Sequence, residues 1–65
     1  TKPIRYKNNL VVGDLEGFLH FVDLKTGSLV GRIQPTKNKL VSLFSHDNFL
    51  FGVDSKGASF LLSVK

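Results

Sequence analysis

The stretch GDLEGFLHFVDLKTG, from Gly13 to Gly27, decides how the rest of the chain is interpreted. It opens with an Asp-x-x-Gly turn, continues with a run of large apolar residues, and ends in a second turn that a glycine closes. From Phe18 to Asp23, successive side chains point to opposite faces of a strand, and both faces are mostly apolar. The stretch therefore predicts a strand between two tight turns. Residues of these types indicate architecture rather than a reaction.

A weaker copy of this stretch follows 40 residues later, because the turn at 14–17 aligns with the turn at 54–57. The alignment brings an aspartate and a glycine of each turn into register. The flanking positions then match in character: Asn8 with Asn48, Leu10 with Leu50, Val11 with Phe51, Phe21 with Leu61, Val22 with Leu62, and Leu24 with Val64. Blades of β-propellers repeat at about 40–50 residues. We therefore predict an all-β fold with about two antiparallel propeller blades.

The polar connector at 34–38 separates the two predicted units. We interpret residues 1–34 as the penultimate blade of a longer propeller, with strands over about 3–6, 10–14, 18–23 and 28–33. Residues 35–65 are interpreted as its closing blade, with strands over about 39–45, 49–53 and 58–64. This blade lacks an outer strand, which the other end of a closed ring can supply without leaving a free edge. We therefore expect the chain to be the C-terminal piece of a longer parent.

The composition is consistent with a piece of a globular protein. The chain has 65 residues and starts at Thr1, and domains of about 60 residues bury only about 60% of their unfolded surface. No apolar run approaches the length of about 18 residues that spans a membrane. The absence of cysteine excludes disulfides, thiolate metal sites and cysteine nucleophiles. We expect such a piece to associate with copies of itself or with missing blades, because its sheet faces and edges lack partners.

Residues of catalytic type occur, but their spacing favours structural roles. The run Ser45-His46-Asp47 contains the three residue types of a hydrolytic triad, yet consecutive residues of a turn diverge in space. Asp14, Glu16 and Asp23 could form a carboxylate pair or bind a hard cation, but aspartate is also preferred for capping the amides of turns. His20 lacks further ligands at zinc-like spacing and is expected to be packed or half-buried. We therefore assign no catalytic, cofactor-binding or metal-binding residue.

The charge balance raises the question of nucleic acid, since the net charge is +4 and the pI is about 9.8. The nine basic residues are scattered rather than clustered. Stacking on bases requires exposed rings beside a basic groove. We place the six phenylalanines in core strands: Phe18, Phe21, Phe44, Phe49, Phe51 and Phe60. No nucleic-acid partner is expected.

The segment from Gly13 to Phe21 reads Gly-Asp-x-Glu-Gly-aromatic-Leu-His-aromatic. It resembles the last complete repeat of the BamB family, the lipoprotein subunits of the bacterial outer-membrane β-barrel assembly machinery. The resemblance extends from Asn8 to Val64, although the second unit matches only at Asp54, Gly57 and its apolar strands.

The wider superfamily is that of the quinoprotein-like propellers, whose repeats end in Asp-x-x-Thr-Gly with a tryptophan four residues after the glycine. Asp23, Thr26 and Gly27 match this pattern, whereas Gly31 occupies the position of the tryptophan. The loss of that ring favours the cofactor-free branch of the superfamily over the pyrroloquinoline quinone dehydrogenases.

The resemblance implies an eight-bladed parent that acts as a non-enzymatic scaffold without a cofactor. The parent would be held at the periplasmic face of the outer membrane by an N-terminal lipid absent from this piece. It would bind the periplasmic domains of the pore subunit BamA and assist the insertion of barrel proteins. The BamA-contacting residues of the family lie in loops of earlier blades, so the partner-binding residues of this chain are unknown. A fragment of a quinone-dependent dehydrogenase and a propeller sensor domain remain alternatives.

Overall fold

The computed structural model describes residues 1–63, which form seven β-strands joined by turns and loops, without a helix in that range. The strands are β1 (Ile4–Tyr6), β2 (Asn9–Gly13), β3 (Leu19–Asp23), β4 (Leu29–Ile33), β5 (Leu40–His46), β6 (Phe49–Asp54) and β7 (Ser59–Ser63). The end of the strand predicted over 58–64, and with it the pairing of Leu24 with Val64, lies outside the described residues.

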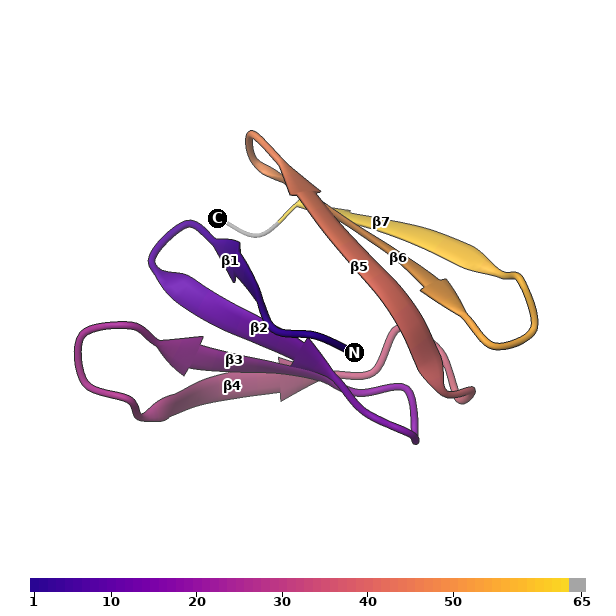
Figure 1. Ribbon diagram of the computed structural model, residues 1–65, viewed down its shortest axis with the longest axis horizontal. Helices are drawn as coiled ribbons and strands as arrows, with labels where there is room; N and C mark the ends of the chain where they lie inside the picture. Colours follow the sequence, from indigo (N-terminus) through magenta and orange to yellow (C-terminus); the bar gives the residue numbers. More distant parts are fainter. Residues whose placement is uncertain (64–65) are drawn as a thin grey trace.

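The strands form two antiparallel sheets, as Figure 1 shows. The first sheet has the order β1-β2-β3-β4, and the second has the order β5-β6-β7. Each strand pairs with the next strand along the chain, since each connection within a sheet is a short turn or loop. The predicted class is therefore confirmed: the fold is all-β and consists of antiparallel propeller blades.

The two sheets repeat each other pair by pair at the offset of 40 residues. The cross-strand row of Ile4, Val11 and Phe21 in the first sheet corresponds to Phe44, Phe51 and Leu61 in the second. Even the residues with positive φ recur, since Lys7 has a φ of 56° and Asp47 a φ of 52°. The repeat is thus present in the backbone as well as in the sequence.

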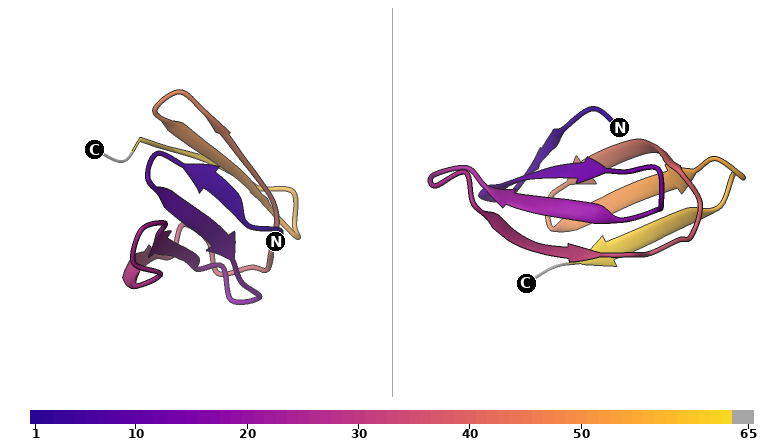
Figure 2. Two further views of the ribbon diagram at one scale, coloured as in Figure 1. Left: turned by 60° about the vertical axis from the view of Figure 1, so that its left-hand side comes forward. Right: turned by 90° about the horizontal axis from the view of Figure 1, so that it is seen from below.

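The core lies between the two sheets. The first sheet contributes Tyr6, Val11, Leu19 and Phe21, and the second contributes Leu40, Leu43 and Leu50, all of them buried. Ile4, Phe60 and Leu62 pack against this cluster. The two views of Figure 2 show the sheets stacked in this way, with β4 and β7 at the back of the molecule. Each sheet therefore buries one face on its neighbour within the described residues.

Hydrogen bonds also join the two sheets. The Tyr6 hydroxyl donates to the Asn48 carbonyl, and the Ser45 hydroxyl donates to the Arg5 carbonyl at 2.9 Å. At the other end of the strands, the Leu40 amide donates to the Asp14 carbonyl at 3.1 Å. The apolar core is therefore flanked by directional contacts, which favour one alignment of the sheets over a slipped one.

Candidate interaction surface

The run Ser45-His46-Asp47 lies at the exposed end of β5 and in the turn that follows. His46 Nε2 is 3.4 Å from Asp47 Oδ2, and both side chains are largely in solvent. The Ser45 hydroxyl donates to the Arg5 carbonyl instead of to His46. A nucleophile must be held by its base to be activated. This arrangement therefore supports a role in joining the sheets.

Asp14 caps the turn that begins the deciding stretch. Its Oδ1 accepts hydrogen bonds from the backbone amides of Glu16 and Phe18, at 2.8 and 2.9 Å. Its Oδ2 lies 2.7 Å from His20 Nε2, and the His20 ring is half-buried as expected. The hydrogen bond from His20, with those from the two amides, holds the pKa of the Asp14 carboxyl below its ordinary value. The Asp14–His20 pair therefore has a structural role in this turn.

Asp54 caps the equivalent turn of the second sheet and also fastens the connector between the sheets. Its Oδ1 accepts from the amides of Lys56 and Ala58, each at 2.9 Å. Its Oδ2 accepts from the Thr36 hydroxyl at 2.7 Å and from the Asn38 side-chain amide at 3.1 Å. The Thr36 hydroxyl contributes most to a pKa of about 2, followed by Asn38. The capping role shared by the two aspartates is therefore observed.

Sequence reasoning missed the part that Thr36 and Asn38 play here, because it treated residues 34–38 as a polar connector. The available signal was a hydroxyl and an amide residue in a short loop, next to a sheet with a repeated aspartate. Asp23 is likewise a cap, accepting from the amides of Lys25 and Thr26. Within residues 1–63, the His, Asp and Glu side chains form no cluster of three that could hold a metal ion.

The structure corrects the placement of the phenylalanines in the core. Phe44 is 60% exposed, and Phe49 and Phe51 are 43% and 39% exposed. The three rings lie on the outward face of the second sheet, which has no sheet against it within residues 1–63, and Leu61 continues this face across β7. We call this surface, formed by Phe44, Phe49, Phe51 and Leu61, the Phe44 face. The described residues of β5, β6 and β7 include no Lys or Arg, so these rings do not border the basic groove that base stacking requires.

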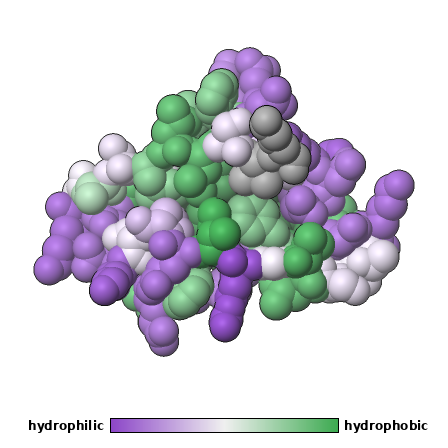
Figure 3. Space-filling model, turned by 180° about the vertical axis from the view of Figure 1, so that it is seen from behind, coloured by the Kyte–Doolittle hydropathy of each residue, from purple (hydrophilic) through white to green (hydrophobic). Residues whose placement is uncertain are grey.

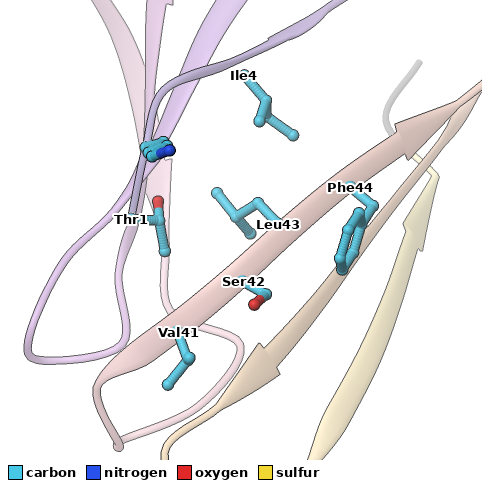
Figure 4. Close-up of a pocket in the computed structure, with 7 residues that line it drawn as sticks. Thr1, Ile4, Val41, Ser42, Leu43 and Phe44 are labelled. Carbon is cyan, nitrogen blue, oxygen red and sulfur yellow. The ribbon is translucent and has the colours of Figure 1, made fainter.

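Apolar surface also extends over the back of the molecule, where Figure 3 shows it interrupted by polar side chains. On the opposite side, a hollow of about 330 Å³ separates the N-terminal segment from β5. Figure 4 shows Ile4 and Leu43 in this hollow with Phe44 near it. Its lining is mainly apolar, and its polar members are Thr1, Lys2 and Ser42. The residues lining this hollow therefore suit packing and do not form a set of convergent catalytic groups.

These observations define a class. Two antiparallel sheets that repeat at 40 residues, and that stack face to face with capped turns at equivalent positions, are blades of a β-propeller. Among the described residues there is no helix of the length and apolarity that crossing a membrane requires. The class is therefore that of the repeat proteins, and the stacked faces and capped turns described here serve the packing of one repeat on the next.

Comparison with known proteins gives the particular resemblance. "Outer membrane protein assembly factor BamB" of Shewanella oneidensis is 60% identical over 42 residues, covering 65% of this chain and 11% of that protein. The BamB of Taylorella asinigenitalis is 51% identical over 39 residues, which cover 60% of this chain and 10% of that protein. The BamB of Escherichia coli is 47% identical over 32 residues, which cover 49% of this chain and 8% of that protein. No protein-family model matches the chain. The predicted resemblance to BamB is confirmed, and the chain spans about a tenth of the length of these relatives.

Proposed function

We propose that this chain forms two structural blades of a non-enzymatic propeller scaffold that takes part in outer-membrane protein assembly. The observation that carries the proposal is the 60% identity over 42 residues to a protein named as an outer membrane protein assembly factor. The fold supports it, because capped turns and stacked sheet faces supply rigidity and surface.

The finer proposal concerns partner and location. The parent binds the periplasmic domains of BamA at the periplasmic face of the outer membrane, and it assists the insertion of barrel proteins. Residues 1–34 form its penultimate blade and residues 35–65 its closing blade. Among residues 1–63, β7 is the last strand of the second sheet. An outer strand from elsewhere in the parent completes the sheet at this edge.

The test is a pull-down of the full-length parent against the periplasmic domains of BamA. Binding of pyrroloquinoline quinone is measured in the same preparation. Capture of BamA without quinone binding is the expected result. Quinone binding without capture would instead place the parent among the dehydrogenases and overturn the proposal. The control is a parent in which residues 36–38 are replaced by glycines. This variant loses the hydrogen bonds from the connector to Asp54, whereas the residues of its other blades are unchanged.

A further inference from the structure

Three segments that are far apart in the sequence meet at one end of the two sheets: the turn at 14–17, the connector at 34–39 and the turn at 54–57. Figure 1 shows them together on the right-hand side of the molecule. The side-chain amide of Gln34 donates to the Glu16 carbonyl at 3.0 Å, which ties the connector to the first turn. This end of the molecule is therefore built from both sheets and the loop between them.

Two lysines flank the Asp54 carboxylate at this end, and Asp54 itself is buried. The side chains of Thr36 and Asn38 donate to one oxygen of this carboxylate, so the backbone of Lys37 between them is held beside it. The Lys56 amide donates to the other oxygen at 2.9 Å. The backbones of both lysines are thus positioned by one buried group.

Lys39 joins this pair from the end of the connector. Its carbonyl accepts a hydrogen bond at 2.8 Å from the amide of Ser55, the residue before Lys56. Lys37, Lys39 and Lys56 are all exposed, and among residues 1–63 no carboxylate forms an ion pair with any of them. Three ammonium groups therefore extend from a fixed backbone, without an acidic partner in the described part of the chain.

An exposed apolar residue belongs to the same end of the molecule. Leu15 is 72% exposed and lies in the first turn. Gly17 of that turn lies against the connector, since a Cβ there would be 2.0 Å from the Thr36 carbonyl oxygen. We call the surface formed by Leu15, Lys37, Lys39 and Lys56 the connector surface. It combines one apolar side chain with three cations.

The connector surface is expected to stay open when further blades are added, because blades stack through the faces of their sheets and not through the turns at the strand ends. The 40-residue repeat supports this. Ser55 is the equivalent of Leu15, and it is exposed although the connector before its blade is in place. Glu16 is the equivalent of Lys56, and it is exposed although the connector after its blade is in place. The exposure of Leu15 and Lys56 therefore does not depend on which residues begin and end the chain.

The chemistry of the connector surface favours an acidic polypeptide over an anionic membrane. Cations at a surface attract a partner of complementary charge, and Leu15 adds an apolar contact. Glu16 is exposed next to Leu15, so a membrane that received Leu15 would bring this carboxylate against lipid head groups of the same charge. A polypeptide segment can place a polar or basic group opposite Glu16 instead.

We propose that the connector surface binds an acidic segment of another protein. Carboxylates of that segment pair with the three lysines, and an apolar side chain of it packs on Leu15. The hydrogen bonds around Asp54 hold the backbone of this surface in one arrangement, so less conformational entropy is lost on binding. This inference goes beyond the proposed function, because its test needs neither BamA nor outer-membrane assembly.

The test measures the affinity of the full-length parent for a fluorescein-labelled peptide, Glu-Glu-Leu-Glu-Glu, by fluorescence anisotropy. A variant with both Lys37→Glu and Lys56→Glu reverses two charges of the connector surface and is expected to bind about tenfold more weakly. The matched control carries Lys7→Glu and Lys25→Glu, in exposed turns at the other end of the first sheet. It has the same net charge and is expected to change the affinity by less than about twofold.

Leu15→Ser tests the apolar part of the surface. Serine is the residue that the second turn has at the equivalent position, Ser55, so the turn is expected to keep its conformation. The affinity for the peptide should fall several-fold. This loss should persist at high salt, whereas the loss from the two lysine substitutions should shrink, because salt screens exposed charges.

Four results would overturn the proposal. The parent fails to bind the peptide, the lysine variant and its control lose affinity equally, or Leu15→Ser binds like the parent. In the fourth, the lysine variant keeps its affinity for the peptide but loses binding to vesicles of phosphatidylglycerol and phosphatidylcholine, which would identify a lipid-binding surface. Circular dichroism checks the fold of each variant. If the double variant unfolds, Lys39→Glu against Lys25→Glu gives the same comparison with single substitutions.

Discussion

Two glycines at equivalent turns differ in what surrounds them. Gly17 and Gly57 have φ values of 88° and 84°, a region that side chains other than glycine rarely adopt. A Cβ at Gly17 would lie 2.0 Å from the Thr36 carbonyl oxygen, whereas a Cβ at Gly57 would have no heavy atom within 4 Å. The first turn therefore supports the connector, and the second does not.

We predict that Gly57→Ala lowers the free energy of unfolding by about 1–2 kcal/mol, the typical cost of left-handed backbone for an alanine. Gly17→Ala is expected to cost clearly more, because the backbone at Thr36 must also move. Urea unfolding followed by circular dichroism measures both variants against the parent chain. Equal losses for the two variants would show that the connector does not rest on Gly17.

Because the Asp54 carboxylate is hydrogen-bonded in the folded chain, we expect the stability of the fold to depend on pH in the acid range. Its pKa in the folded chain is about 2, below the ordinary value of 3.8. The contribution of this group to stability is therefore complete above about pH 4, and it is lost as the pH falls from there through 2. Asp54→Asn is expected to be less stable than the parent chain at neutral pH, and the gap should narrow across this window.

Titration of the Asp54 side chain by nuclear magnetic resonance checks the cause. Thr36→Val removes the hydrogen bond that lowers the pKa most, so the pKa of Asp54 should rise toward 3.8 in that variant. An unchanged midpoint in Thr36→Val would refute this assignment.

At the scale of single strands, substitution of two further glycines is expected to change the free energy of unfolding in opposite directions. Gly31 lies in the exposed edge strand β4, and a Cβ there would meet no heavy atom within 4 Å. Gly52 lies in β6 under the ring of Phe60, whose nearest atom would be 2.1 Å from an added Cβ. Glycine weakens the interior of a strand by about 0.5–1 kcal/mol relative to alanine. The same substitution can therefore stabilise one strand and disrupt the other.

Gly31→Val is expected to leave the chain as stable or to raise the free energy of unfolding by up to about 1 kcal/mol. Gly52→Val is expected to lower it by about 1–3 kcal/mol, because Phe60 must leave its place over the sheet. Thermal unfolding of the two variants measures the difference. A loss of stability in Gly31→Val would indicate that β4 is covered by something other than solvent.

The elements could be predicted from sequence because turn chemistry is local. Asp14 and Gly17 mark a turn whatever surrounds it, and the same holds for Asp54 and Gly57. The exposure of Phe44 could not be derived in this way, since an apolar strand residue is buried only where a second layer covers its face. The contact of Thr36 and Asn38 with Asp54 could not be predicted from the sequence either, because it depends on where the connector passes over a neighbouring sheet.

At the scale of the whole molecule, the two sheets share one core, and among residues 1–63 neither sheet has a buried cluster of its own. Leu50 belongs to the second sheet and is fully buried, and it lies in the same cluster as Val11 and Phe21 of the first sheet. An isolated sheet in water buries little apolar surface, so each sheet is stable mainly while the other covers one of its faces. Loss of a side chain in one sheet should therefore be felt in the other.

We predict that Leu50→Ala lowers the free energy of unfolding by about 2–5 kcal/mol, the usual range for a buried leucine. Hydrogen exchange should then quicken at the paired amides of β2 and β3 as well as at those of β6, although the substitution is made in β6. Val41→Ala serves as the control, because Val41 is 52% exposed and its loss should leave exchange in the first sheet unchanged. If protection in β2 and β3 persisted in Leu50→Ala, the first sheet would be stable without the second. The unit of stability would then be the single blade rather than the interface between blades.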